Sequence, residues 1–504
     1  MKKVIAILLL LAVIMAFVTA CSGKDAEYTG EVIFSKDRVV SLSFDGLGVE
    51  WGTYEDTNKT VKGSWDRVLT AVDRLNPALV RCMTNLDWFV VDFDKHGTDD
   101  AEDDTWGYNF NNKQMVNACD VLDYCQENGV KVAFGVWNVI GNADQKKDIY
   151  GMIPNASADP RWAKMCADLM EYLIKVKGYT CISWFVNTNE PNITGNEGSS
   201  KNYYNTYEKW EQGVKNIRKA FDAIDLKYLD IIGGDTTGIT GCEVYLPKIA
   251  SKLSNVVNNY GIHMYVTQMA IEKGTFKDTI RSLYNITKKK DSDLGKTKQM
   301  YIWESGLLTG KNDTTDCQAL IRNYEYGYLM ADYTIQSILG GVNGVVYWDL
   351  DDAMHFMYGA TGATAKEWGM FSTLASASPA MQEYRPWYHS SVLLTNLFRP
   401  GNVLYDAGGL SQGMRVLATV SEDRTKGGYC VVNSTTRPVT GEFVLEESVK
   451  DSGKLYIYVY NEQNLKLGED GFVVPNYVVD GNLNKKTSIT VPAKGFVVVS
   501  SERL

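Results

Sequence analysis

The spacing of apolar and polar residues changes along the chain and separates two regions. From Gly46 to about Thr395, short apolar runs alternate with longer amphipathic stretches. Short, continuous apolar runs predict strands that are buried on both faces. The runs are "GLGVEW", "ALVRCMTN", "KVAFGVWN", "SWFVNTNE", "YLDIIGGD", "NYGIHMY", "QMYIWESG" and "GVVYWDL". In the stretches between them, such as "SWDRVLTAVDRLN", apolar residues recur every three or four positions, which predicts helices that cover a sheet.

Strands that alternate with helices in this way define an α/β fold class. Eight strand–helix units predict a (β/α)8 TIM barrel over residues 44–395. An open, doubly wound sheet would show the same alternation. However, no G-x-G-x-x-G turn opens a helix after a strand, and the number of units favours the barrel.

From about Asn396 the pattern has a period of two, with Gly, Asn and Asp between the runs. This predicts a C-terminal antiparallel β-sandwich domain over residues 396–504. Residues 21–43 contain a polar tether and then "EVIFS" and "RVVSLSF", which predict N-terminal strands able to join that sandwich. The runs of the C-terminal region are "RVLATV", "GGYCVVN", "GEFVLE", "KLYIYVYN", "GFVVPNYVV", "TSITVPA" and "GFVVVSS".

The N-terminus has the features of an export signal. Two lysines precede an apolar run from Val4 to Val18, and "VTAC" ends at Cys21. We expect residues 1–20 to be a lipoprotein signal peptide and Cys21 to be lipidated, which would anchor the exported protein at a bacterial cell surface or envelope. A plain signal peptide followed by a chance cysteine is the alternative.

The composition argues against several kinds of partner. The net charge of −10 argues against nucleic acid, which favours a basic surface. The remaining cysteines and the four histidines are dispersed without zinc-type spacing, so we predict no metal and no cofactor. The chain is rich in Tyr and Trp, whose rings can stack on sugars but also pack large hydrophobic cores. We expect a monomer.

Polar residues gather where the predicted strands end. In a (β/α)8 barrel the active groups project from the C-terminal ends of the strands. These ends offer two carboxyl groups from different strands, with polar and aromatic neighbours: Arg81, Asn189, Glu190, His263, Tyr265, Glu304 and Trp348. Taken singly, each has an ordinary structural explanation, such as a loop residue for Glu190, an ion pair for Arg81 or a core histidine for His263.

Taken together, these residues resemble those of clan A glycoside hydrolases, a superfamily of retaining (β/α)8 barrels. The resemblance covers residues 44–395 and is greatest to families 39 and 30 or family 5 relatives. In that clan an Asn-Glu pair ends strand four, and a second Glu ends strand seven. The match implies that Glu190 is the general acid/base and Glu304 the nucleophile. Arg81, His263-x-Tyr265 and Trp348 match further clan positions.

The resemblance also implies how these residues act. Retaining hydrolysis needs two carboxyl groups about 5–5.5 Å apart. Glu190 would begin protonated, and Arg81 with the Tyr265 hydroxyl would favour an ionised Glu304. Asn189 would bind the sugar 2-hydroxyl, and Trp348 would form the floor under the reacting sugar.

Three further residues are candidates for substrate binding: Trp51, Trp137 and Asp349. Each could equally belong to the core or to a solvated loop. The expected substrate is a carbohydrate with a β-glycosidic bond, but the sequence predicts neither the sugar nor an exo or endo mode of cleavage. A non-catalytic glycan-binding surface lipoprotein is the alternative, and the presence of both glutamates argues against it. A lyase using the same carboxyl pair is a third reading.

Overall fold

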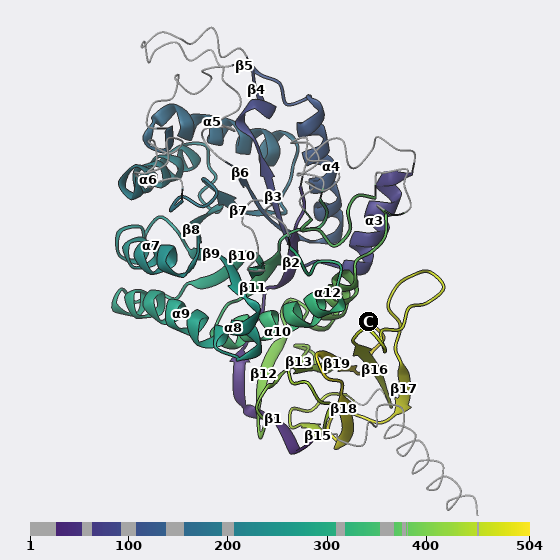
Figure 1. Ribbon diagram of the computed structural model, residues 1–504. Coiled ribbons are helices and arrows are strands. Elements are labelled where there is room, and N and C mark those ends of the chain that lie inside the picture. Colours follow the sequence, from purple (N-terminus) through teal and green to yellow (C-terminus); the bar gives the residue numbers. More distant parts are fainter. Residues whose placement is uncertain are drawn as a thin grey trace, which may run out of the picture.

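A computed structural model describes residues 27–52, 63–91, 107–137, 156–193, 206–308, 318–352, 367–374, 380, 382–450 and 453–504. These residues form a closed eight-stranded barrel surrounded by helices and a separate nine-stranded sheet beside it (Figure 1). The predicted fold class is therefore confirmed. Among the described residues, no helix has the length and apolar character needed to cross a membrane.

The barrel strands are all parallel and follow one another around the barrel in chain order. Pairing of the last with the first closes the barrel, with Tyr347 beside Val49. Each strand coincides with one of the eight apolar runs. The strands are β2 (Gly46–Glu50), β3 (Leu79–Thr84), β6 (Lys131–Val136), β7 (Ile182–Val186), β8 (Asp230–Thr237), β9 (Asn259–Thr267), β10 (Gln299–Leu308) and β11 (Gly344–Tyr347).

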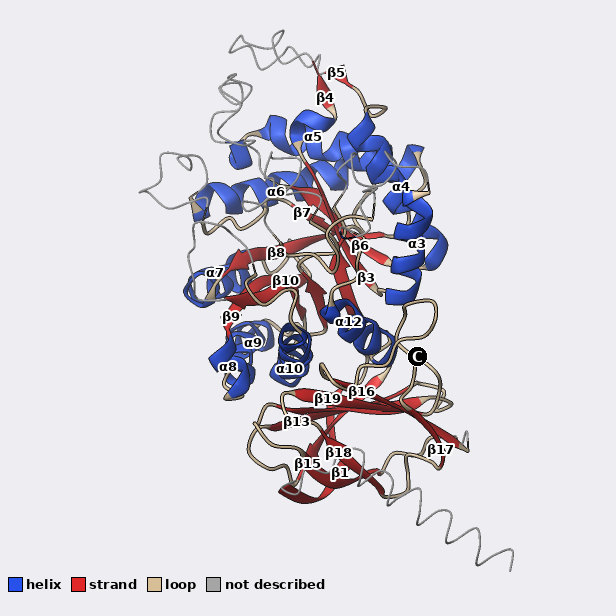
Figure 2. Ribbon diagram, turned by 45° about the vertical axis from the view of Figure 1, so that its right-hand side comes forward, coloured by secondary structure: helices blue, strands red, loops and turns tan. Residues whose placement is uncertain are grey.

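The helices lie outside the barrel, as Figure 2 shows. Local sequence sets their ends: the Asn112 side chain accepts a hydrogen bond from Met115 N at the start of α4, and Gly129, with φ of 67°, ends that helix. The helices are α3 (Ser64–Leu75), α4 (Lys113–Asn128), α5 (Pro160–Glu171), α6 (Tyr207–Ala223), α7 (Ile239–Lys252), α8 (Gln268–Glu272), α9 (Phe276–Asp293), α10 (Tyr324–Gly340) and α12 (Pro386–Leu397). Shorter elements are η1 (Leu86–Trp88), η3 (Ala156–Ala158), η4 (Tyr172–Val176) and the paired β4 (Val90–Val91) and β5 (Gly107–Tyr108).

The second sheet has the strand order β17-β16-β19-β14-β13-β12-β1-β15-β18. Its strands are β1 (Glu27–Ser41), β12 (Val403–Gly408), β13 (Met414–Val420), β14 (Gly427–Asn433), β15 (Val439–Leu445), β16 (Lys454–Tyr460), β17 (Tyr477–Asp480), β18 (Thr487–Val491) and β19 (Gly495–Ser500). Phe34 of β1 stacks on Tyr429 of β14, although these strands are not neighbours in the sheet. The sheet therefore curves over a core of its own.

The N-terminal segment is one long strand where the sequence predicted two short ones. β1 pairs antiparallel with β12 and parallel with β15. Its register with β12 shifts between Phe34 and Val39, and this irregularity interrupts the apolar alternation that the sequence shows there. β1 thus joins the C-terminal sheet, and β12 is a strand that the sequence pattern did not reveal.

A buried ion pair ties the sheet to the barrel. Arg415 of β13 donates to both carboxylate oxygens of Asp332 in α10. Asp332 is fully buried, and it also accepts hydrogen bonds from Gln336 (2.8 Å) and Ser434 (2.7 Å). Its charge is thus satisfied only when the two units are packed together.

We expect Arg415→Met to lower the free energy of unfolding by about 3–5 kcal/mol, because it leaves a buried carboxylate without its cation. Lys164→Met is the matched control: Lys164 pairs with Asp168 on the surface of α5, and its loss should lower stability by less than about 1 kcal/mol. Urea unfolding followed by tryptophan fluorescence measures both. Equal, small effects would show that the ion pair does not hold the two units together.

Candidate active site

The guanidinium of Arg81 is the centre of the site. Arg81 lies inside the barrel on β3 and is fully buried. Nη1 donates to Glu50 (3.0 Å) and Glu304 (2.8 Å), and Nη2 donates to Asn189 (2.7 Å) and Asp235 (2.9 Å). All four N–H groups of the two terminal nitrogens therefore have acceptors, and these come from β2, β8, β10 and the loop after β7. Such a set of charge-assisted bonds fixes the position of each acceptor.

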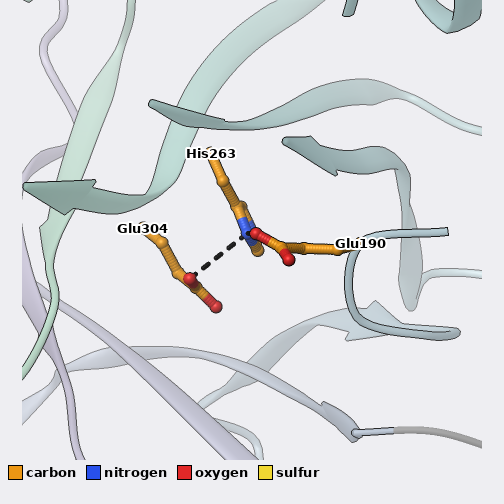
Figure 3. A group of neighbouring side chains, drawn as sticks. All are labelled: Glu190, His263 and Glu304. Atoms are coloured by element: carbon orange, nitrogen blue, oxygen red, sulfur yellow. Dashed lines mark hydrogen bonds and ion pairs between the residues drawn. The ribbon is translucent and has the colours of Figure 1, made fainter. Parts of the chain in front are cut away.

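The two candidate catalytic glutamates flank His263. Nδ1 of His263 lies 3.1 Å from Oε1 of Glu190 and 3.3 Å from Oε2 of Glu304. Figure 3 shows the three side chains gathered in one group. One nitrogen or carboxylate oxygen from each of the three residues lies within 4.8 Å of the other two. The two carboxyl groups therefore have oxygens at most 4.8 Å apart. Glu304 is buried, whereas Glu190 has a side chain that is 20% exposed.

Glu304 reaches the site through an irregularity in β10. Side chains alternate along a regular strand, so Trp303 and Glu304 would point to opposite faces. The register between β10 and β9 shifts between Ile302 and Glu304. Trp303 belongs to the core inside the barrel, and Glu304 nevertheless contacts Arg81 within it. The irregularity thus directs both side chains inward.

Glu190 stands on a turn that its neighbours hold in place. Its φ of 43° lies in the left-handed region, which non-glycine residues adopt at some energetic cost. Glu190 N donates to the carbonyl of Asp235 (3.0 Å), and Asn192 exchanges two hydrogen bonds with the backbone of Thr237, each of 2.9 Å. The loops after β7 and β8 therefore support one another and hold the Glu190 carboxyl near the barrel axis.

His263 is a cation at neutral pH. Burial lowers its pKa, but the negative charges of Asp235 and Glu304 outweigh burial and raise the pKa to about 10. Both ring nitrogens then carry protons, and Nε2 donates to Asp235 at 2.8 Å. Arg81 and His263 in turn hold the pKa of Asp235 below its ordinary value against the effect of burial.

Opposing effects act on the pKa of Glu304. Burial raises the pKa of Glu304, while the positive charges of His263 and Arg81 act to lower it. The Tyr265 hydroxyl donates to Oε2 at 2.7 Å, which favours the carboxylate form. Arg81 and Tyr265 thus both contact Glu304, while burial outweighs them and raises the pKa of Glu304 above its ordinary value.

Asn189 and two indoles complete this part of the site. Because Oδ1 of Asn189 accepts from Arg81, its amide NH2 is the group left to donate to a ligand. The Trp137 ring lies over Arg81, with 5.2 Å from the guanidinium carbon to the ring centroid. Trp348 meets Trp137 edge to face at 5.8 Å. Both indoles therefore lie beside the buried charges.

The remaining candidates, Trp51 and Asp349, are buried side chains. Trp51 is fully buried against Trp65 and Tyr124, among the residues that pack the helices on the barrel. Asp349 is also buried, and burial together with Asp352 and Asp351 raises its pKa well above the ordinary value. Cys21 lies outside the described residues, as does most of the loop that follows Asp352.

Two residues of the site were not singled out in the sequence. Asp235 lies at a register shift in β8 and has a φ of 59°, so its inward direction does not follow from strand alternation. Glu50 is the last residue of β2. Both are carboxyl groups at strand ends, and the strand-end rule applied to strands one and five as well would have identified them.

The group formed by Glu190, His263 and Glu304 has donor atoms close enough to hold a metal ion. The protonation of His263 opposes this use. An imidazole must be neutral to bind a metal, whereas Asp235 and Glu304 keep this ring positively charged. The donors of the group are therefore better suited to proton transfer and hydrogen bonding.

The fold, a closed (β/α)8 barrel with an attached β-sheet domain, is similar to that of several glycoside hydrolases of known structure. The catalytic domain of the family 30 xylanase C from Talaromyces cellulolyticus superposes with a TM-score of 0.63 at 12% identity, covering 93% of this chain and 99% of that one. The family 30 subfamily 8 xylanase from Clostridium acetobutylicum gives 0.58 at 13% identity, covering 93% and 99%.

A family 39 β-xylosidase from Caulobacter crescentus is similar to the same extent, with a TM-score of 0.58 at 14% identity, covering 93% of this chain and 98% of that one. No protein-family model matches the sequence, and neither does any curated protein sequence. At such low identity the similarity establishes the fold.

The charge state of His263 can be tested directly. In ¹⁵N NMR spectra we expect His263 to stay protonated until its titration midpoint at about pH 10. Asp235→Asn should lower this midpoint, because it removes the negative charge that raises the pKa of His263 most. His389 is an internal control, since burial lowers its pKa to about 4 and it should be neutral at pH 7. A His263 midpoint near the ordinary 6.5 in the wild-type protein would contradict this description of the site.

Proposed function

We propose that the protein is a retaining β-glycoside hydrolase, with Glu190 as general acid/base and Glu304 as nucleophile. The observation that carries this proposal is the proximity of the two carboxyl groups, which have oxygens within 4.8 Å of each other. Retaining glycosidases use a carboxyl separation of about 5–5.5 Å, whereas inverting enzymes need roughly 6.5–9.5 Å to admit a water molecule.

The first step forms a glycosyl-enzyme. Glu190 gives its proton to the glycosidic oxygen as the bond to the leaving group breaks, and a carboxylate oxygen of Glu304 bonds to the anomeric carbon. In the second step Glu190, now a carboxylate, takes a proton from water, and the oxygen of that water attacks the anomeric carbon. Glu304 leaves, and the product keeps the configuration of the substrate.

The surrounding contacts support these roles. Arg81 and Tyr265 each donate to Glu304, which favours the ionised form that a nucleophile requires. His263 donates to Oε1 of Glu190, so Oε2 is the oxygen available to exchange a proton with the substrate. The cationic ring stabilises the Glu190 carboxylate that remains after the proton has been given to the leaving group. The amide NH2 of Asn189 is suited to a sugar hydroxyl near the reacting carbon, and Trp348 to an apolar sugar face.

The substrate is a β-linked carbohydrate. Among the proteins of similar fold are two xylanases and a β-xylosidase, so xylan and aryl β-xylosides are the first compounds to test, followed by other aryl β-glycosides and polysaccharides. A non-catalytic glycan-binding protein is not favoured. Binding alone would not require two carboxyl groups that share a cationic histidine, one of them also paired with a buried arginine.

Glu304→Ala should abolish turnover, and azide should restore it with an inverted glycosyl azide as product, because the anion fills the space of the lost carboxylate. Glu190→Ala should lose about 10²–10⁴-fold in rate on substrates with poor leaving groups and much less on dinitrophenyl glycosides. Rates and product configuration are followed by absorbance and ¹H NMR.

Glu127→Ala, at an exposed position of α4, is the matched control and should behave as the wild-type protein does. Near-normal rates for Glu190→Ala or Glu304→Ala on a substrate that the wild-type protein cleaves would contradict the assignment. Inverted product from the wild-type protein would exclude the retaining mechanism.

We also infer that the protein is exported and anchored by a lipid on Cys21, as the N-terminal sequence predicts. Cys21→Ala should move the protein from the membrane fraction to the soluble fraction, because the acceptor thiol is lost. Ser22→Ala, the neighbouring control, should stay in the membrane fraction. Immunoblots of fractionated cells measure both, and unchanged membrane association of Cys21→Ala would refute lipidation at this residue.

A further inference from the structure

The reaction described above has no role for Glu50, although this residue shares a nitrogen with the nucleophile. Glu50 ends β2, and its partner in the register with β3 is Arg81. Nη1 of Arg81 donates both to Oε2 of Glu50 and to Oε1 of Glu304. The side chain of Glu50 is only 3% exposed, and its second oxygen, Oε1, is buried and has no hydrogen-bond partner among the residues that the structure describes.

Charged and titratable groups face Glu50 from several elements. Arg81 contacts it directly, and the negative charges of Glu304 and Asp235 act on it from β10 and β8. Asp349, which follows β11, and the thiol of Cys82 in β3 also interact with it electrostatically. Among the described residues, Arg81 is the one cation within ion-pairing distance of Glu50.

We propose that Glu50 is a positioning residue that serves as the reserve counter-charge of Arg81. When the carboxylate of Glu304 is converted to an ester with the sugar, Glu50 releases its proton to solvent and replaces Glu304 as the anionic partner of Nη1. This role rests on the proposed glycosidase function, because it is defined by the covalent intermediate.

The resting site meets the first requirement of this proposal. Burial, assisted by the negative charges of Glu304 and Asp235, outweighs the opposing effect of Arg81 and raises the pKa of Glu50 to about 8. Glu50 is accordingly protonated at pH 7. Arg81 then has two anionic partners, Glu304 and Asp235, beside the neutral Glu50 and Asn189.

The covalent step changes this balance. A bond forms between Glu304 and the anomeric carbon, the bond to the leaving oxygen breaks, and the Glu190 proton moves to the leaving group. Arg81 loses one anionic partner, and the new negative charge on Glu190 lies beside His263. Glu50 loses a like-charged neighbour, which lowers its pKa, and its proton passes to solvent. Hydrolysis restores the Glu304 carboxylate, and Glu50 takes a proton back.

The physical benefit is that the buried guanidinium keeps its hydrogen-bonded anions throughout the cycle. Loss of one partner from a buried ion pair is strongly unfavourable, because the remaining charge is left uncompensated. With Glu50 ionised, Arg81 retains two carboxylates and the same geometry. Asn189, which is bonded to the other terminal nitrogen, then also stays in place.

Glu304→Gln imitates the loss of charge without requiring a substrate. Protein labelled with ¹³C at the glutamate side-chain carboxyl carbons is titrated by NMR, and Glu50→Gln or Glu50→Asp identifies the Glu50 signal by its disappearance. We expect a Glu50 midpoint near pH 8 in the wild-type protein. In Glu304→Gln the midpoint should fall by about one pH unit or more, because a like charge has gone while the amide oxygen can still accept from Arg81.

Glu190→Gln is the matched control, since it also neutralises a glutamate of the site but one that contacts His263 and not Arg81. Its effect on the Glu50 midpoint should be clearly smaller. An unchanged midpoint in Glu304→Gln, equal shifts in both variants, or a wild-type midpoint near the ordinary 4.5 would each overturn the proposal. These results are independent of turnover, so they are distinguishable from a failure of the glycosidase assignment, which the azide experiment detects.

Discussion

The arrangement of the site depends on how the charge of Arg81 is satisfied inside the barrel. A fully buried guanidinium is tolerated only where well-placed acceptors surround it. Here the acceptors are supplied by Glu50, Asn189, Asp235 and Glu304, each from a different strand or the loop that follows it. The same bonds that satisfy the cation fix the position of the nucleophile and, through Asp235, the charge of His263. The hydrogen bonds of Arg81 therefore have two effects: they compensate its buried charge, and they position the candidate catalytic groups.

Much of the fold could be predicted because parallel strands buried on both faces appear as nearly continuous apolar runs. All eight barrel strands are visible for this reason. Two elements, α10 and β12, were harder to predict from the pattern of apolar residues. α10 is buried almost all round, since it lies between the barrel and the second sheet, and therefore lacks the polar stripe of a surface helix. β12 is short and half-buried, and its pattern does not stand out from the turns beside it.

The site could be predicted in part. The strand-end rule pointed to Arg81, Glu190 and Glu304, which the structure brings together, and to Trp51, which packs elsewhere. Asp235 ends the fifth apolar run, but its inward direction comes from a register shift in β8 and does not follow from regular alternation. Residue types and strand order can be read from a sequence. Side-chain direction at a strand irregularity depends on pairing with the neighbouring strand, which the sequence does not show.

The position of β1 has a consequence for biosynthesis. This strand is the first described element, yet both of its neighbours in the sheet, β12 and β15, follow the whole barrel in the chain. During translation the backbone hydrogen-bonding groups of β1 have no sheet partners until β12 and β15 have been made. The barrel can close before then, because all of its strands lie between these segments. The second sheet is thus completed last, and premature termination would leave an exposed strand edge prone to aggregation.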